Sequence, residues 1–247
     1  MKIAIIGYGK MGRIVEQIAI RRGHTIVSTI DIDNPDDFRS DAFRSADVAI
    51  EFSTPSVAVD NYRYCFAAGI PIVTGTTGWT HRLEEIKNQC EAEGQTFFYA
   101  SNFSIGVNIF FAVNRFLAQL MNHFPAYDVD LKEIHHIHKL DAPSGTAITL
   151  AQDIIDEIDR KNAWHLVNEE TSCQPKELHI TALREDEIPG THEVRYDSTV
   201  DTLTIRHEAK SRAGFALGAV LAAEFTAGKK GFLQMKDLLA QWSIHNS

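Results

Sequence analysis

Three histidines and a lysine lie within five residues of one another, at His135, His136, His138 and Lys139. Histidine donates or accepts a proton near neutral pH, and lysine can do the same where its surroundings lower its pKa. Reducing a C=C or C=N bond needs a hydride on one atom and a proton on the neighbouring atom, and a lysine can also hold a carboxylate. The cluster therefore suits proton transfer to a reducible, anionic substrate.

A second group of polar residues follows this cluster at Ser144, Gly145 and Thr146, directly before an expected helix. Backbone N–H groups at a helix N-terminus bind anions, and the two hydroxyl groups add further donors. A cation and a helix N-terminus close together suit a small substrate with two carboxylates.

The histidines allow two other interpretations. His136 and His138 share one face of a strand and could bind a metal ion, but no third ligand accompanies them, so we expect no metal. The histidines could also be solvated groups at a polar strand edge. In a regular strand His135 and His136 point to opposite faces, so both reach one ligand only if the chain bends there.

A glycine-rich turn lies near the start of the chain, between an apolar strand and a helix. In a GxGxxG turn the first glycine permits the tight turn, the second lets the backbone approach a pyrophosphate, and the third lets the helix lie close to the strand. The helix N-terminus then offers its N–H groups to the phosphates. We expect the cofactor to contact Gly7, Gly9, Lys10, Met11 and Gly12.

Asp31 ends the second expected strand, about 20 residues after the turn, where a carboxylate binds the adenosine ribose. Asp33 is the second candidate for this role. Neither is followed closely by lysine or arginine, so a 2′-phosphate would meet negative charge. The sequence therefore favours NADH over NADPH.

Two further loops follow strands of the same region. Ligands of open α/β sheets lie beyond the carboxyl ends of the strands, so these loops are placed to contact the nicotinamide half of the cofactor, although both could be simple turns. The residues concerned are Gly75, Thr76 and Thr77 after one strand, and Ala100, Ser101, Asn102 and Phe103 after the next.

Strands and helices alternate through the first hundred residues. Strands are expected at residues 2–6, 25–31, 48–52, 70–74 and 96–99, and helices at 10–22, 54–69 and 80–94. The acidic segment 33–41 is expected to be too polar for a core. This alternation predicts an α/β fold with a Rossmann-type, doubly wound parallel sheet.

The pattern changes after Asn102. Helices are expected at 105–123 and 147–161, a strand at 129–137, and several strands joined by turns at 178–209. These features predict a second, α+β domain for substrate binding and oligomerisation, with a mostly antiparallel sheet. Helices at 215–226 and 232–242 complete the first domain, giving domains of 1–103 with 213–247, and of 104–212.

Composition excludes several classes of partner. The formal net charge of −9 argues against nucleic acid or an anionic membrane surface. No apolar run is long enough to span a bilayer, and the three cysteines lack the spacing of a thiolate metal site. We expect a cytoplasmic protein that acts on a small molecule.

With these motifs assembled, the sequence resembles the dihydrodipicolinate reductase family, also called 4-hydroxy-tetrahydrodipicolinate reductases. The resemblance covers nearly the whole chain. It rests on the glycine-rich turn and on the segments Gly75–Gly78, Ser101–Asn108, His135–Ala147 and Ser211–Ala219. The histidine signature HHxHKxDAPSGTA is the most specific of these motifs.

The resemblance implies reduction of a cyclic imine dicarboxylate by NADH or NADPH, in lysine and diaminopimelate biosynthesis. It implies that His135 donates or accepts the proton, that Lys139 is the partnering cationic general acid and carboxylate anchor, and that His136 contacts the substrate. Ser144, Gly145 and Thr146 would hold the other carboxylate. The family also implies a homotetramer assembled largely through the sheet of the second domain.

Two other functions compete with this one. A different two-domain dehydrogenase, acting on an amino acid or a semialdehyde, would share the Rossmann half but lack the histidine signature. An NADH-sensing protein without catalysis would carry a DNA-binding element or a degraded cluster, and this sequence shows neither. The glycine-rich turn and the connection between the second and third strands are shorter than in many family members, and this difference bears on cofactor preference.

Overall fold

A computed structural model describes residues 1–167 and 174–241. The chain divides into two compact units. The first contains Met1–Ile105 and the C-terminal segment from Ala213, and the second contains Gly106–Arg212. Within the described ranges, no helix combines the length and the apolar character that crossing a bilayer requires.

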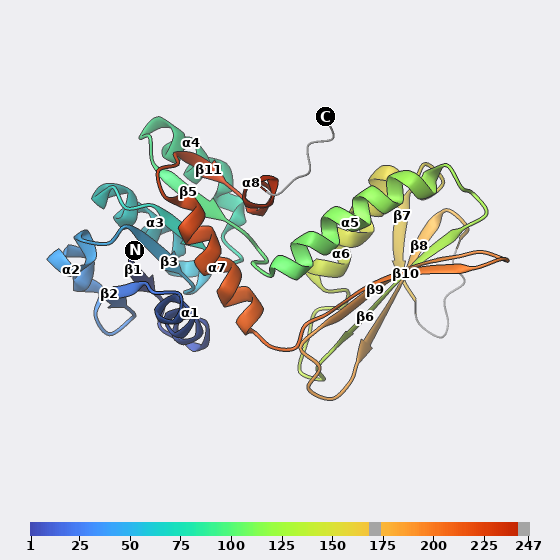
Figure 1. The fold of residues 1–247 in the computed structure, drawn as a ribbon, viewed down its shortest axis with the longest axis horizontal. Coiled ribbons are helices and arrows are strands. Elements are labelled where there is room, and N and C mark those ends of the chain that lie inside the picture. The colour runs from blue at the N-terminus through green and yellow to red at the C-terminus, as the bar shows by residue number, and fades with distance from the viewer. Residues whose placement is uncertain (168–173, 242–247) are drawn as a thin grey trace. The chain divides into compact units, whose positions relative to one another are not determined.

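The first unit is built on a six-stranded sheet in the order β11-β5-β4-β3-β1-β2, and every neighbouring pair is parallel (Figure 1). Its strands are short and almost entirely apolar because helices cover both faces of the sheet. The predicted doubly wound fold is confirmed. The strands are β1 (Lys2–Ile6), β2 (Thr25–Ile30), β3 (Val48–Glu51), β4 (Ile72–Thr74), β5 (Thr96–Tyr99) and β11 (Gly231–Leu233).

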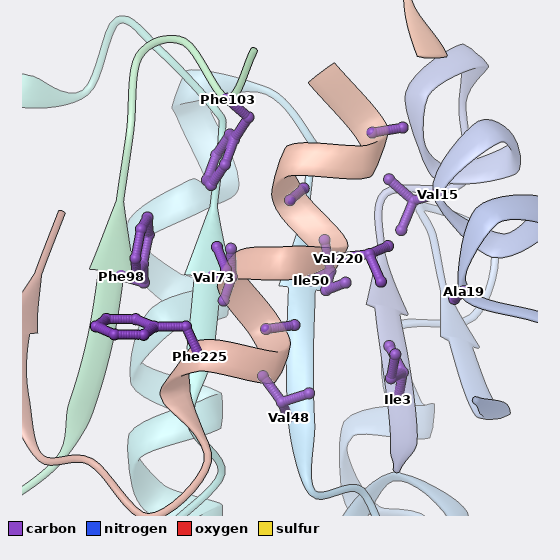
Figure 2. Packing of buried hydrophobic residues seen from close by; sticks show 14 of the residues in the cluster. Ile3, Val15, Ala19, Val48, Ile50, Val73, Phe98, Phe103, Val220 and Phe225 are labelled. Carbon is purple, nitrogen blue, oxygen red and sulfur yellow. The ribbon is translucent and has the colours of Figure 1, made fainter. Parts of the chain in front are cut away.

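Two layers of helices enclose this sheet. The helices and short 3-10 turns are α1 (Lys10–Arg21), η1 (Pro35–Arg39), α2 (Asp41–Arg44), α3 (Pro55–Ala68), η2 (Thr80–Arg82), α4 (Leu83–Ala92), α7 (Ala213–Thr226) and α8 (Met235–Ala240). On one face α1 and α7 pack against the strands, and Figure 2 shows Val220 and Phe225 of α7 directed toward Val48, Val73 and Phe98. On the other face α3 and α4 form a second cluster.

The carboxyl edge of the sheet contains the point where the strand order reverses. β1 pairs with β2 on one side and with β3 on the other. The loops that leave β1 and β3 therefore run to opposite faces and open a crevice between them, which is where open α/β sheets bind ligands. The glycine-rich turn lies at this crevice.

Two local predictions for the first unit are wrong. The segment 33–41 contributes to the core, because Phe38 is only 9% exposed and its ring meets Phe43 edge-on at 5.2 Å. Its acidic neighbours face outward on η1. Phe232 and Leu233 belong to β11 rather than to the expected helix, since they pair in parallel with β5. Trp242, the last residue of that expected helix, lies outside the described residues.

The second unit combines a five-stranded sheet, in the order β10-β9-β6-β8-β7, with two helices. Side chains of α5 and α6 form one buried cluster with those of the sheet. The elements are α5 (Ile105–Asn122), β6 (Asp128–His135), α6 (Gly145–Glu157), β7 (Ala163–Leu166), β8 (Glu177–Arg184), β9 (Thr191–Asp197) and β10 (Thr202–Glu208).

This sheet is mixed rather than mostly antiparallel, which corrects the sequence prediction. The pairs β10–β9 and β9–β6 are antiparallel, whereas β6–β8 and β7–β8 are parallel. A helix between two strands allows them to run parallel, and α6 lies between β6 and the two strands that follow. The short strand β7 was not predicted at all.

Candidate active site

The glycine-rich turn joins β1 to α1. Gly7 has φ +85°, and a side chain there would overlap the carbonyl oxygen of Phe52. Gly12 packs so closely on the carbonyl of Gly7 that a side chain would overlap it as well. The two glycines therefore serve a tight turn and a close helix, as the spacing predicted.

The N-terminus of α1 is open. Gly9 is its N-cap, and a Cβ built on Gly9 would meet no atom within 4 Å. Among the residues that the structure describes, no side chain caps this end of α1. The first N–H groups of a helix need partners, and an anion such as phosphate can supply them.

Two cavities flank this turn. The larger measures about 580 Å³ and the smaller about 330 Å³. Both are lined by Gly9, Phe52 and Ser53, so they adjoin at the turn. A dinucleotide has two nucleotide halves joined by a pyrophosphate, and two adjoining cavities at a glycine-rich turn fit that shape.

Asp31 lines the larger cavity together with apolar side chains that include Ile32 and Phe38. The Asp31 carboxylate is oriented by two backbone N–H groups, from Tyr8 at 3.2 Å and from Ile32 at 2.9 Å. Among the described residues, no lysine or arginine lines this cavity. The carboxylate of Asp31, which directly follows β2, is thus held at the wall of the larger cavity.

The smaller cavity collects five of the remaining predicted cofactor residues. It is lined by Lys10, Met11, Gly75, Thr76 and Thr77, besides the residues that it shares with the larger cavity. Loops that are far apart in the sequence therefore meet here.

Five predicted cofactor residues line neither cavity, namely Gly12, Ala100, Ser101, Asn102 and Phe103. Gly12 is buried under the turn. The Phe103 side chain belongs to the core, with its ring 5.8 Å from that of Phe98. Of the four residues after β5, Ser101 is exposed, Asn102 is half-buried, and the other two are buried.

A buried carboxyl group that we did not predict lies beneath the smaller cavity. Glu51 ends β3, is fully buried, and accepts hydrogen bonds from Ser53, Thr74 and Thr76. Its only signal in the sequence was a charged residue at the end of an otherwise apolar strand.

The second unit places the histidine cluster at the end of β6. Side chains two residues apart on a strand share a face, so Glu133 and His135 both turn inward, and they are 0% and 7% exposed. His135 Nδ1 lies 3.6 Å from Glu133 Oε2. The strand ends at His135, so His136 follows in a turn and the regular alternation stops there.

Glu133 is the centre of a network of buried polar groups. Both of its oxygens accept the backbone N–H of Ser144 at 3.1 Å, and Oε2 lies 3.6 Å from Nε2 of His192. Burial alone would raise the pKa of Glu133, but its interactions with His192 and Ser144 outweigh that effect and lower the pKa to about 2. Glu133 is therefore an anion at neutral pH.

Burial has the opposite consequence for His135, because it penalises a charged imidazole. It lowers the pKa of His135 to about 4, against an opposing effect of the Glu133 carboxylate, and the nearby His192 and Lys139 lower it further. In the absence of substrate His135 is neutral at pH 7. A bound anion would raise its pKa and prepare it to hold a proton.

Lys139 lies in the turn that follows the cluster. Its Nζ donates to Asp141 at 2.7 and 2.8 Å, and its side chain is 21% exposed. Arg184 of β8 braces this turn, because it donates to the carbonyl oxygens of Lys139 at 3.2 Å and Asp141 at 2.5 Å. The same guanidinium reaches Glu133 at 3.3 Å.

The N-terminus of α6 contains the other predicted substrate residues. Ser144 is the N-cap, its hydroxyl accepts from Ala147 N–H at 3.2 Å, and it lies 3.1 Å from His192 Nε2. Its hydrogen-bonding groups are thus used within the protein. Gly145 is exposed, with no atom within 4 Å of an added Cβ, and Thr146 is half-buried.

The remaining histidines of the cluster differ in their surroundings. His136 is half-buried, and its buried Nδ1 has no hydrogen-bond partner among the described residues. His138 is exposed and lies 3.1 Å from Glu187. His136 therefore keeps one ring nitrogen buried and without a hydrogen bond among the described residues, whereas His138 contacts Glu187 at the surface.

One group of described residues is close enough to share a metal ion, since ligand atoms of Glu133, His135 and His192 lie within 4.8 Å of one another. The guanidinium of Arg184 already neutralises the Glu133 carboxylate. A divalent metal ion bound here would be repelled by the positive charge of Arg184. The arrangement therefore favours proton transfer over metal binding.

Sequence analysis missed three residues of this site. Glu133 stands two positions before His135, so strand periodicity could have found it. His192 and Arg184 come from β9 and β8, and only the pairing of these strands with β6 brings them to the cluster.

Comparisons with known proteins cover both units. A family model described as dihydrodipicolinate reductase, N-terminus, matches residues 1–103, and one described as dihydrodipicolinate reductase, C-terminus, matches residues 106–239. The chain belongs to the dihydrodipicolinate reductase family. The family's two halves follow the division into a dinucleotide-binding unit and a unit with the histidine cluster.

Individual relatives agree. A 4-hydroxy-tetrahydrodipicolinate reductase of Christiangramia forsetii is 47% identical over 244 residues, which cover 97% of this chain and 98% of the relative. A protein of the same name from Staphylococcus haemolyticus is 34% identical, with 91% and 94% covered. The solved dihydrodipicolinate reductase of Paenisporosarcina sp. TG-14 has the same fold, with a TM-score of 0.74, 21% identity, and 95% and 97% of the two chains covered.

Proposed function

We propose that this protein reduces 4-hydroxy-tetrahydrodipicolinate to tetrahydrodipicolinate with NADH or NADPH, the reduction step of lysine and diaminopimelate biosynthesis. The observation that carries the proposal is the family match, because it spans both the unit with two adjoining nucleotide cavities and the unit with the Glu133–His135 pair. Each half of the reaction, hydride supply and proton transfer, has residues that suit it.

The first unit binds the cofactor, which supplies the hydride when bound. Gly7 and Gly9 let the backbone approach the pyrophosphate, and the open N-terminus of α1 offers N–H groups to it. The loop of Gly75, Thr76 and Thr77 lines the cavity for the nicotinamide half. Ala100, Ser101, Asn102 and Phe103 are assigned to the cofactor only because their loop follows β5, the neighbour of β4 in the sheet.

The second unit manages the proton and the substrate carboxylates. His135 exchanges the proton, and the Glu133 carboxylate, 3.6 Å from Nδ1, stabilises the charged form of its ring. Lys139 anchors one carboxylate and leaves its pairing with Asp141 to do so. Gly145, at the exposed start of α6, contributes to the site for the other carboxylate, with Thr146 beside it.

His136 and Ser144 complete this assignment. We assign the substrate contact to His136 because this half-buried residue directly follows His135, the last residue of β6. Ser144 serves the substrate indirectly, because its N–H and hydroxyl are used to shape the N-terminus of α6.

Asp31 supports a preference for NADH. Its carboxylate lines the adenosine cavity, accepts two backbone N–H groups, and has no lysine or arginine among the residues that line the cavity with it. A ribose 2′-hydroxyl can donate to a carboxylate, whereas a 2′-phosphate is repelled by it.

The test is to follow oxidation of NADH and of NADPH by the purified protein, using the product of the preceding synthase as substrate. Substrate-dependent oxidation supports the proposed reaction, and a higher kcat/KM with NADH supports the role of Asp31. If the folded protein binds NADH but does not oxidise it when this substrate is added, the proposed reaction is wrong. An NADH sensor or another dehydrogenase then becomes the better explanation.

We also propose a cytoplasmic homotetramer. The resemblance implies assembly through the sheet of the second unit. In the same unit α5 carries a row of exposed apolar side chains, Ile109, Val113, Phe116 and Leu120, which are 44–62% exposed. An apolar row of this kind favours burial in an assembly, and light scattering of the purified protein tests the number of copies.

A further inference from the structure

Glu51 is a buried acid that the proposed chemistry does not use. It is 0% exposed at the end of β3, in the first unit. Burying a carboxyl group is costly unless hydrogen bonds satisfy it, so its retention needs a reason. The hydrogen-bond partners of Glu51 indicate what it does.

The carboxyl group connects the ends of two neighbouring strands. Oε2 accepts from the hydroxyl of Thr74, the last residue of β4, at 2.5 Å. Oε1 accepts from Thr76 at 3.0 Å and from the hydroxyl and N–H of Ser53. Ser53 and Thr76 line the smaller cavity, whereas Glu51 and Thr74 lie behind it.

Further contacts make this connection rigid. The N–H of Ser53 also donates to the Thr76 hydroxyl at 2.8 Å, so the two loops are linked directly as well as through Glu51. Tyr62 OH lies 3.0 Å from the Thr74 hydroxyl, which anchors the group to α3. Phe52 lies against Gly75, where a side chain would overlap its ring.

The charges around Glu51 are unusual for a buried acid. Its hydrogen-bond partners among the described residues are hydroxyl groups and one backbone N–H, with no lysine, arginine or histidine among them. Burial raises its pKa, and the hydrogen bonds from Ser53, Thr74 and Thr76 oppose that effect. The group is suited to holding the two loops in place rather than to pairing with a cation.

We propose that Glu51 is a positioning residue for the nicotinamide half of the cofactor, because it fixes the loops after β3 and β4 that line the smaller cavity. This inference rests on the proposed function in one respect, since it takes that cavity as the nicotinamide site. It adds a residue that touches neither cofactor nor substrate and yet sets the geometry of hydride transfer.

The experiment compares three variants. Glu51→Gln replaces one of the two acceptor oxygens with an NH2 donor while keeping the size of the side chain. Thr74→Val removes one donor to Glu51 and leaves the cavity lining unchanged. Thr96→Val is the matched control. Thr96 is 2% exposed and its hydroxyl donates to Lys229 O at 2.6 Å, so this variant also loses a side-chain hydrogen bond. Thr96 begins β5 and so lies at the amino ends of the strands, whereas Glu51 and Thr74 lie at the carboxyl ends.

Dissociation constants for NADH are measured by fluorescence without substrate, alongside the melting temperature and, where turnover is present, the KM for each substrate. We expect Glu51→Gln and Thr74→Val to raise the dissociation constant for NADH about ten-fold, equivalent to about 1.4 kcal/mol. The KM for the dicarboxylate should stay within about two-fold. Thr96→Val should lower the melting temperature and leave NADH binding unchanged.

If both variants bind NADH as the wild type does while melting earlier, Glu51 is only structural and the inference is overturned. Should Glu51→Gln fail to fold, Thr74→Val alone decides between these outcomes. Because NADH binding is read without substrate, a wild type that binds NADH but reduces no dicarboxylate refutes the proposed function without touching this result.

Discussion

The buried neutral histidine predicts a specific loss of stability on acidification. The pKa of His135 is about 4 in the folded chain, against an ordinary value of 6.5. Between these values the unfolded chain binds a proton that the folded chain does not. Folding stability is therefore complete above pH 6.5 and falls as the pH decreases toward 4.

The magnitude follows from the difference between the two pKa values. The difference is about 2.5 pH units, and at about 1.4 kcal/mol per unit it amounts to about 3 kcal/mol by pH 4. Between pH 6.5 and pH 5 the loss from His135 is about 2 kcal/mol. Glu133, whose pKa is lowered to about 2 from 4.5, loses its contribution only below pH 4.5, so the range above pH 5 separates the two groups.

The assay is urea denaturation at several pH values from 5 to 8, read by amide hydrogen exchange of β6. This readout reports unfolding of the second unit separately from the first. His207, whose pKa is also lowered by burial, contributes in the same direction, so the comparison is between the wild type and His135→Gln. The variant should lose about 2 kcal/mol less than the wild type between pH 6.5 and pH 5.

A control variant replaces His138, whose side chain is 69% exposed, with glutamine. Its stability should follow the wild type across the whole range, because solvent reaches this imidazole in the folded chain too. Equal losses in the wild type and in His135→Gln would refute the reasoning. His135 would then be accessible to water, and its neutral state could not be attributed to burial.

Three further predictions concern the proposed binding groups. Lys139→Ala should lower kcat by about 10²–10⁴-fold, as loss of a proton-transfer partner does, while calorimetry still detects NADH binding; weaker binding of NADH would contradict this role. Asp31→Ala should raise the KM for NADH about ten-fold, through loss of a charged hydrogen bond, and bring it closer to the KM for NADPH. An unchanged KM for NADH would assign the ribose contact to Asp33 instead. Gly7→Ala should destabilise the chain by about 2–5 kcal/mol, from backbone strain and overlap with a neighbouring carbonyl. Gly23→Ala, which has the same φ of +85° with no atom nearby, should cost only the strain, and equal melting temperatures would show that the overlap is relieved.

Local features of the first unit could be predicted from the sequence because each depends on neighbouring residues. The strand, turn and helix around Gly7 follow from glycine spacing between apolar segments, and Asp31 follows from the length of the same unit. β11 could not be predicted, because three apolar residues fit a helix as well as a strand. Only its parallel pairing with β5 makes it a strand.

The charged groups of the two sites could not be predicted from neighbouring residues in the sequence. Glu51 acquires its role from hydroxyls of Thr74 and Thr76, which lie 23 and 25 positions away in the sequence. Arg184 and His192 reach Glu133 only because β8 and β9 pair with β6 on its two sides. The mixed sheet that makes this possible depends on a helical crossover, and strand patterns alone do not reveal it.

The two buried acids show how neighbours decide what a carboxyl group can do. Both stand at or near the carboxyl end of a strand, and burial raises the pKa of each. At Glu133 the His192 imidazole and the side chain and backbone N–H of Ser144 reverse this effect, so the group places a negative charge 3.6 Å from His135. At Glu51 only neutral donors are present, and its pKa stays raised. A carboxylate beside His135 stabilises the imidazolium that proton transfer requires, whereas a carboxyl group behind the cofactor loops serves best as a hydrogen-bonding anchor. We therefore propose that the same residue type supports proton transfer in one unit and loop geometry in the other.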